Sequence, residues 1–318
     1  MFPLVQFLWR SFLRVTRSHR RQPYDLVHVH NVPDFMIFAA LYPRLKGTRT
    51  ILDIHDVVPE FYASKFGTHA DGAIGRLLLQ MERLSAAMAD EVIIANDLWQ
   101  ERYIKRTGTE GRCRAMINFA DSSIFHRRER TRQDGKLIVL FPGGLQRHQG
   151  VDVAIRAFAQ VAQELVQAEF HIYGEGSEKT ALLKLSDDLG LGEKIRFFGS
   201  LSIREIAKVI ANADLGVVPK RADSFGNEAY STKIMEFMAC GVPVVVSSTK
   251  VDRYYFDDSV VRFFESGSVE ALTREMLILL KSANLRQELA NRASAYAERN
   301  CWERQKERYL DLVDCLTC

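Results

Sequence analysis

Two carboxylates lie on either side of the start of a short apolar segment in the last third of the chain. The stretch SFGNEAYSTKIMEFMACGVPVVVS runs from Ser224 to Ser247 and contains Glu228 and Glu236, with seven residues between them. Carboxylates accept hydrogen bonds, and ligand hydroxyl groups can donate them. The pair therefore raises the question of which hydroxyl-bearing ligand it serves.

Side chains that favour a helix start lie between the two acids. Ser231 and Thr232 are N-cap candidates, while Gly241 and Pro243 stop a helix, so we expect a helix over residues 231–240. The free N–H groups and the dipole at the start of that helix would attract an anion such as a phosphate. The same segment is thus suited to an anionic group as well as to hydroxyl groups.

Both acids are expected at one end of this helix. Glu228 would lie in the loop before it and Glu236 in its second turn, and side chains tilt back toward a helix N-terminus. Lys233 would add positive charge beside the anion. A nucleotide sugar combines a diphosphate with ribose and hexose hydroxyls, so this stretch predicts a nucleotide-sugar site.

The elements that position these residues alternate between short apolar strands and amphipathic helices. Expected strands include YDLVHVHN, TRTILDIHD, DEVIIAN, LIVLFPGG, EFHIYGEG, KIRFFGS, DLGVVP and PVVVSS, with helical patterns between them and a final helix from Trp302. Alternation of this kind predicts parallel sheets covered by helices on both faces. The 318 residues suit two such domains, so we predict an α/β fold of two tandem Rossmann-like, doubly wound domains that bind ligands at the carboxyl ends of their strands.

Composition narrows the class of protein further. A chain with 47% hydrophobic and 26% charged residues folds, and a net charge of +3 gives no support to nucleic-acid binding. The sequence contains no apolar run of about 18 residues and no signal-peptide cleavage site, so we expect a cytoplasmic protein. Its five cysteines are odd in number and scattered, as reduced thiols are.

The first 24 residues contain no acid and form a basic amphipathic pattern. Arg10, Arg14, Arg17 and Arg21 share one helical face, whereas apolar side chains fall largely on another. Two interpretations remain open and are compatible. The helix packs on a sheet, or its basic face rests on an anionic membrane surface.

Several motifs occur in an order that resembles a known family. Besides the Glu-x7-Glu pattern followed by MACGVPVV, the chain contains YDLVHVHN, ADEVIIAN, PGGLQRHQGVDVAIRAF and FHIYGEGSE. Together they resemble glycosyltransferase family 4 (glycosyl transferases group 1), whose members are retaining enzymes of the GT-B fold. The resemblance covers essentially the whole chain. The charged stretch over 126–136 lacks apolar periodicity and is predicted to be a linker. The resemblance implies an incomplete acceptor-side domain over 1–125, a nucleotide-sugar-binding domain over 137–300, and a terminal helix over 301–318 that returns to the first domain.

The resemblance also implies roles for individual residues. Glu236 would bind the donor ribose, and Glu228 would contact the transferred sugar. His55, in LDIHDVVPE, would lie near that sugar and the β-phosphate. Gly144 would allow backbone to approach the phosphates, and Gly174 in YGEGSE matches a glycine turn of the family, although a G-x-G turn also occurs without any ligand.

The chain departs from the family pattern at two places. The family commonly has Arg and Lys at positions occupied here by Gly144 and Gln149, so we expect Arg147 and Lys220 to act as substitute cations for the diphosphate. The family also opens with a strand and a glycine-rich loop, and about 60–80 residues of a usual first domain have no counterpart before YDLVHVHN. A truncated, catalytically impaired homologue or non-catalytic partner subunit that keeps nucleotide binding is therefore the alternative.

Metal use is not expected from the sequence. His28 and His30 share one face of a strand, but no third ligand is spaced to join them, which favours a structural role. The chain has no Asp-x-Asp pair to hold a nucleotide through a metal. A metal-dependent hydrolase that uses these residues with His55 is a further alternative. Our expectation is a metal-independent hexosyltransferase that uses a UDP- or GDP-linked sugar and a polysaccharide or lipid-linked glycan acceptor, without a cofactor.

Overall fold

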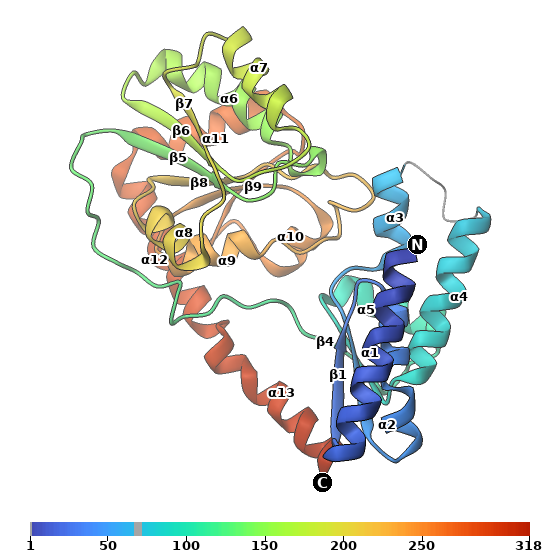
Figure 1. Cartoon of the computed structure of the whole chain (residues 1–318). Helices are drawn as coiled ribbons and strands as arrows, with labels where there is room; N and C mark the ends of the chain where they lie inside the picture. Colours follow the sequence, from blue (N-terminus) through green and yellow to red (C-terminus); the bar gives the residue numbers. More distant parts are fainter. Residues whose placement is uncertain (1, 67–71) are drawn as a thin grey trace. The chain divides into compact units, whose positions relative to one another are not determined.

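The computed structural model describes residues 2–66 and 72–318, and it divides the chain into two compact units (Figure 1). Unit 1 contains the chain up to Asn118 together with Lys306–Cys318, and unit 2 is Phe119–Gln305. The division therefore falls at 118/119, seven residues before the predicted 125. The second crossing lies inside the terminal helix.

Unit 1 is built on a four-stranded parallel sheet in the order β1-β2-β3-β4. The strands are β1 (Leu26–His30), β2 (Arg49–Ile54), β3 (Glu91–Ile94) and β4 (Cys113–Ala115). The helices are α1 (Phe2–Arg21), η1 (Asp34–Ala40), α2 (Leu41–Leu45), α3 (Val58–Phe66), α4 (Ala73–Met88), α5 (Asp97–Thr107) and the part of α13 (Trp302–Thr317) that follows Gln305. Leu312 of α13 packs against Ile51 and Ile93 of the sheet.

The register of β1 against β2 places polar residues side by side. Because the strands are parallel, His30 at the end of β1 is the partner of Asp53 near the end of β2, and His28 is the partner of Ile51. Successive side chains of a strand point to opposite faces, so His28 and His30 share one face.

Unit 2 is a six-stranded parallel sheet in the order β10-β9-β8-β5-β6-β7. Its strands are β5 (Leu137–Pro142), β6 (Ala168–Tyr173), β7 (Ile195–Phe198), β8 (Leu215–Val218), β9 (Val244–Ser247) and β10 (Arg262–Phe264). Its helices are η2 (Arg147–Gln149), α6 (Val151–Glu164), α7 (Lys179–Asp188), α8 (Ile203–Ala211), α9 (Thr232–Ala239), α10 (Lys250–Tyr255), α11 (Val269–Lys281) and α12 (Ala283–Arg299). The strand order reverses between β5 and β8, and a parallel sheet offers its ligand crevice at such a reversal.

The core of unit 2 consists of two buried clusters. One contains Phe158 and Phe170, from α6 and β6, and the other contains Phe237 from α9 with Val244 from β9. Burial of aromatic and β-branched side chains from adjacent elements is the main stabilising contribution in such a layered fold. These clusters hold α9 firmly against the strands at whose ends it begins.

The structure confirms the predicted fold class of two α/β domains with parallel sheets. The expected helix over 231–240 is α9, which begins after the N-cap Ser231 and ends before Gly241, whose φ of 71° is the left-handed value that stops a helix. The sequence analysis left residues 250–300 without elements, and this stretch forms α10, β10, α11 and α12. Strand β10 has only three residues and α10 six, too few for a periodic pattern to show.

The segment predicted as a linker, 126–136, forms neither helix nor strand and belongs to unit 2. Arg130 and Arg132 donate to the two carboxylate oxygens of Asp214, at 2.7 and 2.6 Å, and Asp214 is buried. The lack of apolar periodicity suggested a linker because apolar patterns do not reveal attachment through buried charge. Ion pairs fix this segment to Asp214, directly before β8.

Membrane spanning is a separate question from membrane contact. None of the helices that the structure describes is long and apolar enough to cross a membrane.

Candidate functional site

A cavity of about 410 Å³ lies in unit 2 at the ends of β5 and β6 and the start of α9. It is formed where the strand order reverses, as expected for a ligand site of a parallel sheet. Five residues predicted for donor binding line it, namely Gly144, Gly174, Thr232, Lys233 and Glu236. The other lining residues are Pro142, Gly143, Tyr173, Glu175, Ser200, Leu201 and Ile206.

The start of α9 opens onto this cavity. Ser231 is the N-cap residue, and within the described structure its side chain caps no N–H group of the helix. Thr232 instead hydrogen-bonds through its side chain to the Glu236 carboxylate one turn later. The first N–H groups of an eight-residue helix are therefore left for an anion.

Lys233 supplies a positive charge at the same place. Its Nζ donates to Oε1 of Gln149 at 2.6 Å and lies 4.9 Å from the centre of the Phe141 ring. A Cβ atom at position 143 would lie 2.9 Å from that Nζ, so Gly143 leaves the space that the ammonium group uses. Gln149 is the position where the resemblance leads one to expect a lysine, and the structure brings Lys233 to it from another element.

Burial changes the proton affinities of both charged groups in the cavity. It lowers the pKa of Lys233 to about 8, partly opposed by the nearby Glu236 carboxylate and reinforced by Lys220. It raises the pKa of Glu236, while Lys233 and the Thr232 hydrogen bond act in the opposite direction. A bound anion would therefore stabilise the charged form of Lys233. Hydroxyl donors would stabilise the charged form of Glu236.

Two glycines let the loops after β5 and β6 approach each other. The N–H of Gly143 donates to the Tyr173 carbonyl at 2.8 Å, and Gly174 has a φ of 144°. A Cβ on Gly174 would lie 1.9 Å from the carbonyl oxygen of Gly143, a distance no side chain can occupy. Gly174 is therefore required by backbone contact at the cavity wall, in addition to any contact with a ligand.

Glu228 and Lys220 lie away from the cavity lining. Glu228 is in the loop between β8 and α9, with Oε1 4.0 Å from Nζ of Lys250. Lys220 is buried, and its Nζ donates to the Ala229 carbonyl at 2.6 Å and lies 3.0 Å from Oδ2 of the fully buried Asp252. Lys220 thus holds the loop that carries Glu228.

Arg147, the other predicted cation, is the first residue of η2 and is exposed. Its backbone carbonyl accepts a hydrogen bond from Arg221 Nε at 3.2 Å. Among the three cations considered from the sequence, Lys233 is the one whose side chain lines the cavity. The resemblance drew attention to loop positions, whereas the cation comes from the helix.

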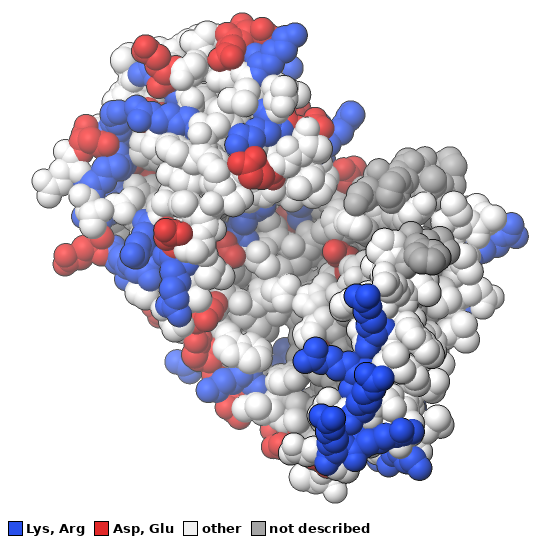
Figure 2. All heavy atoms as spheres, viewed as in Figure 1, with Lys and Arg blue, Asp and Glu red and all other residues white. Residues whose placement is uncertain are grey.

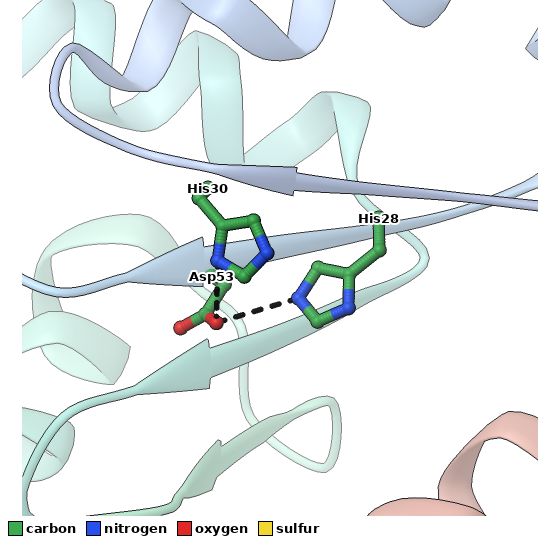
Figure 3. Close-up of side chains that lie close together, drawn as sticks. All are labelled: His28, His30 and Asp53. Carbon is green, nitrogen blue, oxygen red and sulfur yellow. Dashed lines mark ion pairs between the residues drawn. The ribbon is translucent and has the colours of Figure 1, made fainter. Parts of the chain in front are cut away.

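His55 belongs to unit 1, where it lies just after β2. Its backbone N–H donates to Oδ1 of Asn31 at 2.8 Å, and its Nε2 lies 2.9 Å from Nδ1 of His30. Asp53 of β2 faces His30 and His28 of β1 (Figure 3). The sequence analysis missed Asp53, although the parallel register of two neighbouring strands could have indicated it.

Sequence reasoning also missed the apolar part of the cavity in unit 2. Tyr173 ends β6 and stacks on Phe198 of β7 with ring centroids 4.4 Å apart, and Leu201 and Ile206 line the same space. Apolar residues at strand ends resemble ordinary core residues in the sequence. Two larger hollows, of about 650 and 620 Å³, lie in unit 1, and their linings contain none of the predicted site residues.

Comparison with known proteins places the chain in a family. The family model described as glycosyl transferases group 1 matches residues 122–296, more than half of the chain. The chain belongs to the glycosyl transferases group 1 family. A second model, the glycosyl transferase 4-like domain, matches residues 2–118 of this group 1 family member. The family resemblance drawn from the motifs is therefore confirmed.

The group 1 chain is similar to characterised proteins over different parts of their lengths. It is 30% identical over 244 residues to D-inositol 3-phosphate glycosyltransferase 1 of Catenulispora acidiphila. This alignment covers 71% of the chain and 56% of that protein. The chain thus spans little more than half the length of this relative. The structure of Anabaena Alr3699/HepE in complex with UDP matches with a TM-score of 0.77 and 18% identity, covering 96% of this chain and 82% of the other.

A second structural likeness covers nearly the whole of both chains. WaaG, described as a glycosyltransferase involved in lipopolysaccharide biosynthesis, matches with a TM-score of 0.71 and 17% identity, over 96% of this chain and 95% of the other. At this identity the likeness bears on the fold. The predicted GT-B architecture of this group 1 family member is confirmed by it.

Proposed function

We propose that this protein is a retaining glycosyltransferase that moves a sugar from a UDP- or GDP-linked donor to a polysaccharide or lipid-linked glycan acceptor. The observation that carries the proposal is the cavity in unit 2. There the N-terminus of α9, the Lys233 ammonium group and the Glu236 carboxylate lie together at the reversal of strand order in a chain of the group 1 family.

The chemistry of the cavity divides in the same way as that of a nucleotide sugar. The diphosphate suits the α9 N–H groups and Lys233, since both favour negative charge. The ribose hydroxyls suit Glu236, which accepts hydrogen bonds. The base suits the apolar surface of Tyr173, Leu201 and Ile206.

The proposed reaction requires no protein nucleophile. The bond between the anomeric carbon and the β-phosphate oxygen breaks, the acceptor oxygen bonds to the anomeric carbon from the same face, and the leaving phosphate takes the acceptor proton. The protein then contributes by stabilising the charge on the leaving diphosphate and by positioning the sugar. In this proposal Lys233 and the α9 N-terminus do the first, and Glu228 does the second, held by the loop that Lys220 fixes. His55 keeps its predicted catalytic role as a prediction.

The relatives support the donor and acceptor classes of the proposal. The Anabaena neighbour was crystallised in complex with UDP, and WaaG is described as taking part in lipopolysaccharide biosynthesis. A metal is absent from the proposed donor contacts because Lys233 and the helix end supply the positive charge.

A thermal-shift screen over UDP-, GDP- and ADP-sugars tests donor binding. A ligand at 100 times its Kd stabilises the native state by about 2.7 kcal/mol, which raises the melting temperature measurably. We expect one nucleotide class to stabilise the protein and Lys233→Met to remove most of that shift. Lys184→Met, on an exposed face of α7, is the matched control and should keep the full shift. No shift with any nucleotide sugar would contradict the proposal, and binding without sugar transfer would support the non-catalytic alternative.

Donor affinity should weaken as the pH rises through the pKa of Lys233. The pKa of this group is lowered to about 8 in the free protein, and a bound diphosphate favours its charged form. Below about pH 7 the lysine is already protonated, whereas above about pH 8 binding must take up a proton. We therefore expect the Kd for the nucleoside diphosphate, measured by calorimetry, to rise by up to about tenfold per pH unit above 8. Lys233→Met should bind more weakly and without this pH dependence, so an unchanged profile in the variant would assign the proton to another group.

Association with an anionic membrane surface belongs to the same proposal, through α1. Figure 2 shows a group of basic side chains over this helix with no acidic ones among them, and the helix sequence contains no Asp or Glu. In its first half Leu4, Val5, Phe7 and Trp9 are exposed, whereas His19 in its last turn is buried. The helix thus packs at its end, against η1 and α2, and offers apolar and basic groups at its beginning, which supports the membrane-surface interpretation.

Binding to vesicles tests this surface. Basic residues near an anionic bilayer contribute about 1 kcal/mol each and are screened by salt, so we expect sedimentation with phosphatidylglycerol vesicles at low salt and release at high salt. Replacing Arg10, Arg14 and Arg17 with Gln should abolish it. The same number of changes on exposed arginines of unit 2, Arg292 and Arg299 of α12 with Arg204 of α8, is a charge-matched control. Equal binding to neutral and anionic vesicles would contradict the electrostatic part of the proposal.

A further inference from the structure

Unit 1 contains a cluster of metal-ligating side chains outside the donor cavity. His28 and His30 of β1 stack with ring centroids 4.5 Å apart, and Asp53 of β2 lies against both (Figure 3). Oδ2 of Asp53 is 3.0 Å from Nδ1 of His30 and 3.4 Å from Nε2 of His28. Two strands that are neighbours in the sheet therefore bring three ligand atoms to one point.

Hydrogen bonds within the protein account for only part of this arrangement. In the described part of the chain, Nε2 of His28 is buried and makes no hydrogen bond, although it faces the Asp53 carboxylate. Nδ1 of His30 lies 2.9 Å from Nε2 of His55, so only one of these two nitrogens can donate to the other. A bound ion at His28 Nε2 would therefore displace no hydrogen bond of that nitrogen.

The distances from the Asp53 oxygen to the two imidazole nitrogens are close to those around a small, tetrahedrally coordinated cation. Zinc binds imidazole nitrogen at about 2.0–2.1 Å and carboxylate oxygen at about 2.0–2.2 Å, which puts neighbouring ligand atoms of a tetrahedron about 3.3–3.5 Å apart. The separations from Asp53 Oδ2 are 3.0 and 3.4 Å, and all three ligand atoms lie within 4.8 Å of one another. An ion could enter with only small side-chain movements.

The surroundings also suit a metal centre. The second ring nitrogen of His28 lies 2.8 Å from the hydroxyl of Tyr309 on α13, and a partner of this kind fixes ring orientation and tautomer. His28 and Asp53 are 20% and 15% exposed, while His30 is 58% exposed and leaves a path from solvent. A preformed site with an entry path results.

We propose that His28, His30 and Asp53 bind one divalent transition-metal ion, with Zn²⁺ as the best match to two imidazoles and a carboxylate. The fourth position is open to water or to His55, whose Nε2 is 3.4 Å from the same Asp53 oxygen. This inference does not depend on the proposed donor contacts, which lie in unit 2, and it is tested by metal binding alone. It also revises the expectation that no third ligand joins the two histidines.

Calorimetry with Zn²⁺ on the metal-free 318-residue chain tests the site. Cys315→Ser/Cys318→Ser should be the background, because this exposed pair of thiols could bind zinc by itself. We expect one equivalent to bind in this background. Asp53→Asn and His30→Gln should each weaken binding more than the about 10–100-fold expected for Tyr309→Phe, which removes only an orienting partner. His30 is exposed, so His30→Gln keeps the test valid if Asp53→Asn fails to fold.

The control and the spectroscopic readout separate this site from adventitious binding. His126→Gln changes an exposed histidine of unit 2 and should leave the Zn²⁺ affinity unchanged. Substituted Co²⁺ should show the absorption of nitrogen and oxygen ligands without a thiolate charge-transfer band. The proposal is overturned if the Cys315→Ser/Cys318→Ser background binds no zinc, or if His30→Gln and Asp53→Asn bind it as tightly as that background.

Discussion

Alanine at position 228 should lower kcat of sugar transfer by on the order of a hundredfold or more, while alanine at position 236 should mainly raise KM for the donor. The two substitutions are expected to change different kinetic constants because the two carboxylates contact different parts of one ligand. Glu236 lines the cavity beside Lys233 and is proposed to contact ribose, which changes little between ground and transition states. Loss of such uniform binding raises KM.

Glu228 is proposed to contact the sugar whose anomeric bond breaks. Its charge and position matter most where charge and shape change most, so its loss acts on the transition state. The surrounding loop is well fixed, with the Glu228 N–H bonded to the Phe225 carbonyl at 3.1 Å and the Ala229 carbonyl held by Lys220. Truncation of the side chain should therefore leave the backbone in place.

The kinetics are measured as release of nucleoside diphosphate with the donor that gives the largest thermal shift. Glu288→Ala, an exposed carboxylate on α12, is the control and should show wild-type kinetics. Melting temperatures of all three variants establish that each is folded. Wild-type kinetics in both site variants, or a change of KM alone for Glu228→Ala with a change of kcat alone for Glu236→Ala, would refute the assignment.

Replacement of Lys220 by Met should lower the free energy of unfolding by about 3–5 kcal/mol, because it leaves the buried Asp252 carboxylate without its counter-charge. Asp252 Oδ2 also accepts a hydrogen bond from Thr249 at 2.6 Å, but a hydroxyl does not replace an ammonium group. Burial lowers the pKa of Lys220, and the Asp252 carboxylate opposes that shift, so the charged form of the lysine depends on this partner. For a unit of this size the loss corresponds to a melting temperature roughly 6–20 °C lower.

Thermal unfolding of the whole chain measures this effect. Two further variants separate the loss of the buried counter-charge from the loss of an ordinary ion pair. Lys281→Met removes an ion pair with Glu164 in which both side chains are about half exposed, and it should cost less than about 1 kcal/mol. Lys220→Met/Asp252→Leu removes both charges and should recover much of the loss. Similar melting temperatures for Lys220→Met and Lys281→Met would show that the pair is worth no more than a surface contact.

The sequence contained enough to predict the elements around the donor cavity, and their physical basis is local. Helix α9 follows from an N-cap residue and a terminating glycine, and Lys233 and Glu236 follow from their places in its first two turns. Strand alternation fixed the fold class because apolar periodicity is a property of neighbouring residues. These features require no knowledge of distant contacts.

Features that depend on distant contacts were not predicted from the sequence. Lys220 was expected at the diphosphate, but it pairs with Asp252, which lies 32 residues later in the chain. Nothing in the sequence indicates that these two residues form a buried ion pair. Asp53 joins His28 and His30 only through the register of β1 and β2. Arg130 and Arg132 likewise bind an aspartate that the sequence places more than 80 residues away.

The position of Lys233 has a consequence for how this chain can evolve. The ammonium group occupies space left free by Gly143 and donates to Gln149. Which residues are tolerated at any one of positions 143, 149 and 233 therefore depends on the residues at the other two. A side chain at 143 would push the Lys233 ammonium group out of its place, and a second cation at 149 would repel it. The charge can therefore move from helix to loop only through linked substitutions, and a single change along that path passes through an intermediate with either two cations or none.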